Sequence, residues 1–141
     1  MTQRIETRPG WQLITHRIRA ADVETRAHCL RTLATRALNE LAQRNYDTLE
    51  LQMDSSTTLA RLRQLAEAAD DQYLKSLDNN DGDADDEVMD QFSIARALAA
   101  LVFARVGDGA NEILESAYEL AVISPEVEQG LLSEMTAAVA Q

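Results

Sequence analysis

The sequence predicts an all-α fold, a compact bundle of five or six helices. Good helix formers such as Ala, Leu, Glu, Gln and Arg are abundant, whereas the chain has only two Phe, three Tyr, one Trp and few β-branched runs. Apolar residues recur at steps of three and four in several segments. A length of 141 residues suits one continuous core. We therefore expect residues 1–141 to form a single helical domain.

The first two predicted helices follow a break at Pro9-Gly10. Residues 11–20 form a short helix, and Asp22 caps a longer one that runs through Arg44. The apolar residues of the longer helix alternate steps of four and three, so they share one face. They are Val23, Ala27, Leu30, Ala34, Ala37 and Leu41. The arginines off this face are expected to point into water: Arg26, Arg31 and Arg36.

A third helix and an acidic loop complete the first half of the chain. The run Ser55-Ser56-Thr57 suits the start of a helix, which is expected to fray near Leu77. Residues 78 to about 87 have no apolar periodicity and contain several turn formers. We expect them to form an acidic loop that separates the two halves of the bundle.

The second half begins with the helix that should be most deeply buried. Residues 88–106 include an unbroken apolar run from 97 to 104, so this helix is apolar nearly all round. Gly107-Asp108-Gly109 then makes a tight connection in which Asp108 can cap the next helix. A connection this short implies that the two helices are antiparallel.

Two further helices complete the predicted bundle. The first covers residues 110–123, buries its apolar residues and is expected to turn three carboxylates outward: Glu112, Glu115 and Glu119. Ser124-Pro125 then supplies a cap and a proline at the first position of the last helix. That helix is expected to run to about Val139.

Charge is distributed unevenly along the chain. Residues 1–44 hold eight Arg and four Asp or Glu, whereas residues 45–141 hold five Lys or Arg and twenty Asp or Glu. The formal net charge is −11. Such asymmetry affects solubility, steering and the choice of partner. We also expect the N-terminal arginines to pair with the chain's own acidic half.

Catalytic and metal-binding motifs are missing from the sequence. It contains no G-x-S-x-G, P-loop, dinucleotide fingerprint or paired-cysteine metal motif, so we expect neither enzymatic activity nor a cofactor. If Gly82 is set at the sixth position of a calcium loop, Leu77 and Val88 occupy positions that require Asp and Glu. Glu24 and His28 are four residues apart, whereas di-iron bundles use Glu-x-x-His. We therefore expect no metal site.

The sequence also indicates a compartment. Cys29 is the only cysteine, so no intramolecular disulfide can form. The longest apolar run has eight residues, against roughly 20 for a membrane span, and the first residues lack an apolar targeting stretch. We expect a cytoplasmic protein that binds no membrane and, because its net charge opposes phosphate, no nucleic acid.

From about residue 30 to residue 122, the order of features resembles the YjaG-like family of uncharacterised bacterial helical proteins. A helix over 33–41 is followed by a short loop, and residues 51–54 lead into a helix over 59–68. An acidic linker precedes residues 92–98 and 112–121. The resemblance implies an all-helical fold with no assigned activity.

Together these patterns predict a small acidic protein-binding module. Its most concrete form is an inhibitor or immunity-type protein that neutralises a basic partner, such as a toxin or effector domain. The expected partner-binding residues are Asp81, Asp83, Asp85, Asp86, Glu87 and Asp90, with Glu112, Glu115 and Glu119 as a second ridge.

Two alternatives stay open at this point. One is a structural or assembly subunit that forms a homodimer or joins a larger complex through an exposed apolar surface. The expected surface comprises Trp11, Leu13 and Ile14 together with Leu131, Leu132, Met135 and Val139 of the last helix. The other is an enzyme with a carboxylate-lined, metal-dependent pocket, which no residue spacing supports.

Overall fold

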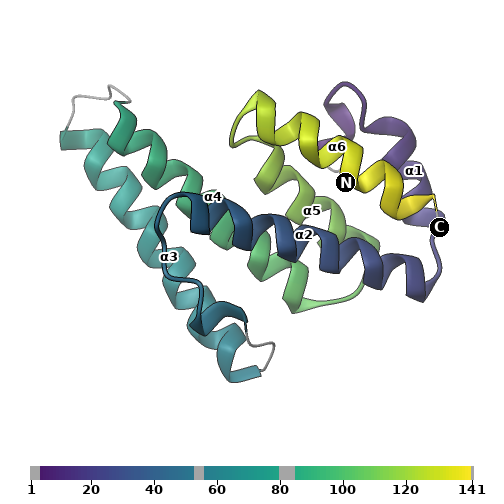
Figure 1. Ribbon diagram of the computed structural model, residues 1–141, viewed down its shortest axis with the longest axis horizontal. Coiled ribbons are helices and arrows are strands. Elements are labelled where there is room, and N and C mark those ends of the chain that lie inside the picture. The colour runs from purple at the N-terminus through teal and green to yellow at the C-terminus, as the bar shows by residue number, and fades with distance from the viewer. Residues whose placement is uncertain (1–3, 53–55, 80–84, 141) are drawn as a thin grey trace.

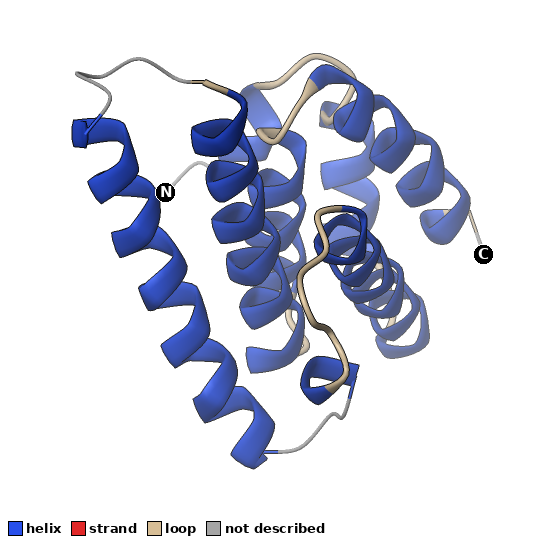
Figure 2. Ribbon diagram, turned by 60° about the vertical axis from the view of Figure 1, so that its left-hand side comes forward, coloured by secondary structure: helices blue, strands red, loops and turns tan. Residues whose placement is uncertain are grey.

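The chain folds as a bundle of α-helices (Figures 1 and 2). The computed structural model describes residues 4–52, 56–79 and 85–140, except for the side chains of residues 56–58. Over these ranges it contains six α-helices, two short 3₁₀ helices and no strand. The all-α prediction is therefore confirmed.

The helices occur close to their predicted positions. They are α1 (Gln12–Ala20), α2 (Val23–Gln43), α3 (Ser56–Asn79), α4 (Asp86–Val106), α5 (Ala110–Ala121) and α6 (Pro125–Val139). The 3₁₀ helices are η1 (Arg4–Thr7) and η2 (Glu50–Gln52). The loop predicted over 78–87 is shorter than expected, because α3 continues to Asn79 and α4 begins at Asp86. Its middle, residues 80–84, lies outside the described residues.

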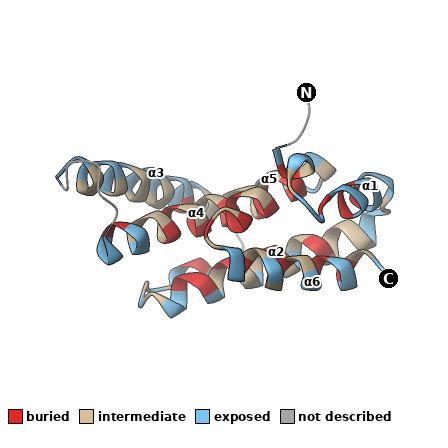
Figure 3. Ribbon diagram, turned by 90° about the horizontal axis from the view of Figure 1, so that it is seen from above, coloured by how far each residue is buried: buried red, intermediate tan, exposed pale blue. Residues whose placement is uncertain are grey.

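Helix α4 is central, as its apolar run predicts. It packs against α2, α3 and α5, and its Leu98 and Leu101 are completely buried. Helices α1 and α6 cover the other side of the body, where both contact α5 and each other. Figure 3 shows the buried residues gathered on α2, α4, α5 and α6, whereas α3 is largely half-buried or exposed. The core therefore lies mainly to one side of α4.

The connection between α4 and α5 confirms the predicted antiparallel pair. The hydroxyl of Ser116 in α5 donates to the carbonyl of Ala100 in α4 at 2.7 Å. A second hydrogen bond joins Arg96, one turn before Ala100, to Glu119, one turn after Ser116. The register therefore runs in opposite directions along the two helices. Gly109, rather than Asp108, occupies the N-cap of α5, so that predicted cap is wrong.

The side chain of Glu112 folds back over this connection. A Cβ at Gly107 would lie 2.5 Å from its carboxylate oxygen, which the flexible Glu112 side chain could move to accommodate. Two predicted caps elsewhere are confirmed: Asp22 accepts the Thr25 amide at 2.8 Å, and Ser124 accepts the Val127 amide at 3.1 Å. The cap predicted to begin at Ser55 lies outside the described part of the chain.

The apolar surface predicted to form a homodimer is mostly buried within the chain. Trp11, Ile14, Leu131 and Met135 belong to the core, and Leu132 and Val139 pack half-buried against it. Leu13, by contrast, is 61% exposed. The expected exposure of these side chains is wrong, because α1 lies against α5 and α6 and covers them. This surface therefore offers little apolar area to a second copy.

The predicted pairing of N-terminal arginines with the acidic half is confirmed for four of the eight arginines, whereas Arg19 binds Glu6 within the N-terminal part. Arg4 contacts Glu115 at 3.0 Å, and Arg8 contacts Glu128 at 2.7 Å. Arg36 and Arg44 reach acidic residues of α6 and α4 respectively. Arg31 is exposed, as predicted, but Arg26 and Arg36 are half-buried.

Over the described residues, no helix is both long enough and apolar enough to cross a membrane.

Candidate acidic partner-binding surface

Helices α3 and α4 form an antiparallel pair whose register is fixed by two contacts. The rings of Tyr73 and Phe92 lie 5.3 Å apart between centroids. Further along, the guanidinium of Arg96 donates to the carboxylate of Asp70. The last turn of α3 and the first turn of α4 therefore lie at the same end of the molecule (Figures 1 and 2).

This end carries a concentration of carboxylates. Residues 67–90 contain ten Asp or Glu, and Lys75 is the only Lys or Arg among them. We define the acidic surface as the exposed carboxylates of this pair that the structure describes beyond Asp70: Asp71, Asp78, Asp85, Asp86, Glu87 and Asp90. The predicted residues Asp81 and Asp83 lie outside the described residues.

Three of these carboxylates have a local reason to stand where they do. Asp85 is the N-cap of α4, and its side chain accepts the Val88 amide at 2.9 Å. Asp86 and Glu87 occupy the first turn, where the partial positive charge of a helix N-terminus stabilises anions. The same effect explains why the predicted loop is helical from residue 86 onward. Part of the acidic surface therefore also stabilises the start of α4.

Asp90 connects the acidic surface to the body of the bundle. Its side chain is 68% exposed and lies 4.0 Å from the Arg44 guanidinium at the end of α2. Arg44 itself binds more closely to the buried Glu40, at 2.8 Å. Because Asp90 is mostly solvated and has only this long contact, it stays accessible to a partner.

The second predicted ridge does not face outward as expected. Glu119 is only 5% exposed and accepts a hydrogen bond from Arg96 at 2.6 Å. Glu115 binds Arg4, and Glu112 lies half-buried over the turn before α5. The predicted outward orientation of Glu115 and Glu119 is wrong, because Arg4 of η1 and Arg96 of α4 pack against α5 and bind them there. The signal in the sequence was Arg96 itself, a charged residue within the otherwise apolar middle of α4.

Burial and pairing act in opposite directions on the Glu119 carboxyl. Desolvation raises its pKa above the usual value, and the nearby Arg96 guanidinium partly lowers it again. Arg96 also binds Asp70, so it joins α3, α4 and α5. These contacts assign Glu119 to the bundle's internal ion pairs and leave the α3–α4 end as the principal acidic surface.

Potential metal ligands and the thiol of Cys29 are the other candidate functional groups among the described side chains. Among them, no group of three or more His, Cys, Asp or Glu residues is placed to hold a metal ion. Cys29 is completely buried, and burial raises the pKa of its thiol to about 11. A thiol in that state is protonated near neutral pH and is a poor nucleophile. What this arrangement supplies is negative charge on an exposed helical end.

Comparisons with known proteins identify no relative of this chain. No family model, curated protein or solved structure matches it. The resemblance to the YjaG-like family therefore stays a prediction, and function has to be inferred from the residues themselves.

Proposed function

We propose that this chain is a small protein-binding module that binds a basic partner protein through its acidic surface. The most concrete form is an inhibitor or immunity-type protein that neutralises a basic toxin or effector domain. The observation that supports the proposal is the set of exposed carboxylates at one end of the α3–α4 pair, where residues 67–90 hold a single cation, Lys75.

The ion pairs of the molecule distinguish this end from the rest. Over the described residues, no Lys, Arg or His nitrogen lies within 4.0 Å of five of its six carboxylates: Asp71, Asp78, Asp85, Asp86 and Glu87. Crowded like charges repel one another, and Arg or Lys from a partner relieves that repulsion. The same field attracts a basic protein before contact and raises the association rate.

Helix stability alone does not account for this distribution of charge. The start of α4 favours Asp86 and Glu87, but Asp78 lies in the last turn of α3, where the helix dipole disfavours an anion. Asp71 lies four residues before Lys75 in α3, a spacing that can stabilise a helix weakly, so its position is less informative. Asp78 supports a use outside the fold, which binding to a basic partner would supply.

The test compares three tagged forms of the full chain. The first is the wild type, and the second has four neutral substitutions in the acidic surface: Asp71→Asn, Asp78→Asn, Asp86→Asn and Asp90→Asn. The third is a control with the same change in net charge at exposed carboxylates elsewhere: Glu24→Gln, Asp47→Asn, Asp108→Asn and Glu126→Gln. Each form is used to capture proteins from lysate of the source cells at low and at high salt, and retained proteins are identified by mass spectrometry.

The proposal predicts that the wild type and the control retain the same basic protein in stoichiometric amount. The variant of the acidic surface should lose it, and high salt should weaken retention by the wild type because screening shortens the range of the charges. Equal retention by all three forms would show that the acidic surface is not the binding site. Recovery of the chain alone would count against a basic partner.

A further inference from the structure

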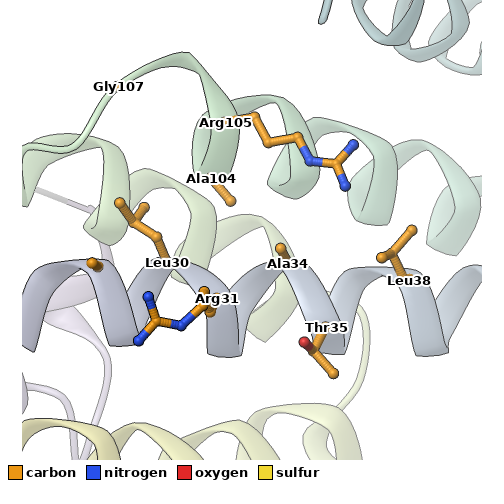
Figure 4. A pocket seen from close by; sticks show the side chains of 9 residues that line it. Leu30, Arg31, Ala34, Thr35, Leu38, Ala104, Arg105 and Gly107 are labelled. Carbon is orange, nitrogen blue, oxygen red and sulfur yellow. The ribbon is translucent and has the colours of Figure 1, made fainter. Parts of the chain in front are cut away.

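A groove of about 590 Å³ lies between α2 and the C-terminal end of α4 (Figure 4). Leu30, Ala34 and Leu38 of α2 line it together with Ala104 of α4. Ala104 lies fourteen positions after Asp90 in α4, which corresponds to about 21 Å along a helix. The groove is therefore separate from the acidic surface.

The groove exists because α2 has more apolar surface than its neighbours cover. One stripe of α2 is completely buried and consists of Cys29, Leu33, Ala37 and Leu41. Leu30, Ala34 and Leu38 form a second stripe with the same spacing of four, and these side chains are only half-buried. A stripe of this kind forms a ridge against which another helix can pack. The small side chains of Ala34 and Ala104 allow the backbone of such a docked helix to approach closely.

The charge of the groove differs from that of the molecule. Arg31 of α2 and Arg105 of α4 both line it, and Figure 4 shows them extending from the two helices that form it. None of the residues that line the groove is Asp or Glu, although the chain has 24 acidic residues against 13 Lys and Arg. An apolar floor with arginines beside it complements a ligand that is apolar on one face and anionic at its margins.

We infer that this groove docks an amphipathic helix of a partner protein, with apolar residues on the floor and Asp or Glu placed beside the exposed Arg31. The floor from Leu30 to Leu38 extends about 12 Å along α2, so two to three turns of a partner helix cover it. This inference goes beyond the proposed function, because it concerns a second site that selects the opposite charge.

The test uses a defined probe, an amidated, fluorescein-labelled peptide of eighteen residues. Its Leu and Ala residues follow helical spacing on one face, and Glu residues flank that face. A second peptide has the same charges with Ser in place of Leu. Binding to the full chain is measured by fluorescence anisotropy, and the site is mapped by ¹⁵N–¹H shifts. At physiological ionic strength the Debye length is about 8 Å, so the distant acidic surface is largely screened from the groove.

The Leu peptide should bind with a Kd below about 1 mM, shift the resonances of the groove, and bind more tightly than the Ser peptide. Reversal of one rim charge, Arg31→Glu, should weaken binding roughly tenfold because an attraction becomes a repulsion. The control is Arg17→Glu, which makes the same charge change at an exposed position of α1. It should leave the Kd within about twofold, since it lies outside the groove. Thermal melts of both variants verify that they fold.

Three results would overturn the inference. The first is no binding by the Leu peptide up to 1 mM, and the second is equal weakening by Arg31→Glu and Arg17→Glu. The third is a set of groove resonances that shift with protein concentration when no peptide is present. In that case a second copy of the chain, and not an acidic helix of another protein, would occupy the groove.

Discussion

Replacement of Glu119 by Gln should destabilise the bundle by breaking a largely buried ion pair. The Glu119 side chain in α5 accepts from Arg96 of α4 at 2.6 Å and lies 3.7 Å from Arg4. Gln keeps the shape of the side chain but removes its charge, so Arg96 retains only Asp70 as an anionic partner. The substitution therefore tests the contact that joins α5 to the α3–α4 pair.

The magnitude follows from burial. Loss of one partner from a fully buried ion pair costs about 3–5 kcal/mol. Arg96 is 22% exposed and keeps Asp70, and the neutral Gln avoids the desolvation that raises the pKa of Glu119. Both effects reduce the cost, so we expect the free energy of unfolding to fall by about 2 kcal/mol, or roughly 6–8 °C in Tm for a chain of this length.

Urea denaturation followed by circular dichroism measures this change, with the slope m expected to stay constant. The matched control is Glu115→Gln in the same helix, because Glu115 also binds an arginine, Arg4, which is 56% exposed. Loss of an exposed pair should cost less than about 1 kcal/mol. If Glu119→Gln costs no more than Glu115→Gln, the Glu119–Arg96 contact contributes no more than a surface pair and the reasoning from burial is wrong.

Two further predictions concern titration and reactivity. Hydrogen bonds from Arg8 and then Trp11 hold the pKa of Glu128 below its usual value of 4.5, so the folded chain binds fewer protons there than the unfolded chain. The stabilisation from the ionised Glu128 is present above pH 4.5 and is lost as the pH falls. The free energy of unfolding, followed by Trp11 fluorescence from pH 6 to pH 3, should therefore fall less steeply in Glu128→Gln than in the wild type. An equal pH dependence in the two proteins would contradict this. Cys29 should react with a thiol reagent at pH 8 only after unfolding, because burial raises its pKa to about 11; rapid reaction of the native chain would show that the thiol is accessible.

The sequence predicted the fold well where the signals are local. The cap residues Asp22 and Ser124 act within three residues of themselves, and a short stretch of sequence suffices to find them. The apolar run of 97–104 likewise predicted the central helix, because a helix that is apolar all round needs neighbours on several sides. The acidic composition of the α3–α4 end is also evident from the sequence, although the helical state of residues 86 and 87 depends on capping by Asp85.

The errors arose where distant residues decide the environment of a side chain. Periodicity places Glu119 on the polar side of α5, but it cannot show that Arg4 and Arg96 meet it there. It also cannot show that α1 folds back over the last helix, which buries Trp11 and Met135. The groove along Leu30 and Leu38 cannot be predicted from the sequence for the same reason. Their spacing fits a core stripe, and only the packed structure shows that it is half covered.

A comparison of two acidic residues can separate charge that stabilises the fold from charge that does not. Asp86 opens α4, so Asp86→Asn should destabilise the chain by about 0.3–1 kcal/mol, whereas Asp78 lies in the last turn of α3, so Asp78→Asn should stabilise it by a similar amount. Urea denaturation of the two variants measures both signs. If Asp78→Asn is destabilising, its carboxylate supports the fold and the case for an outside use weakens. If it stabilises the fold and also weakens capture of a basic partner, the acidic surface costs stability in exchange for binding, as functional sites often do.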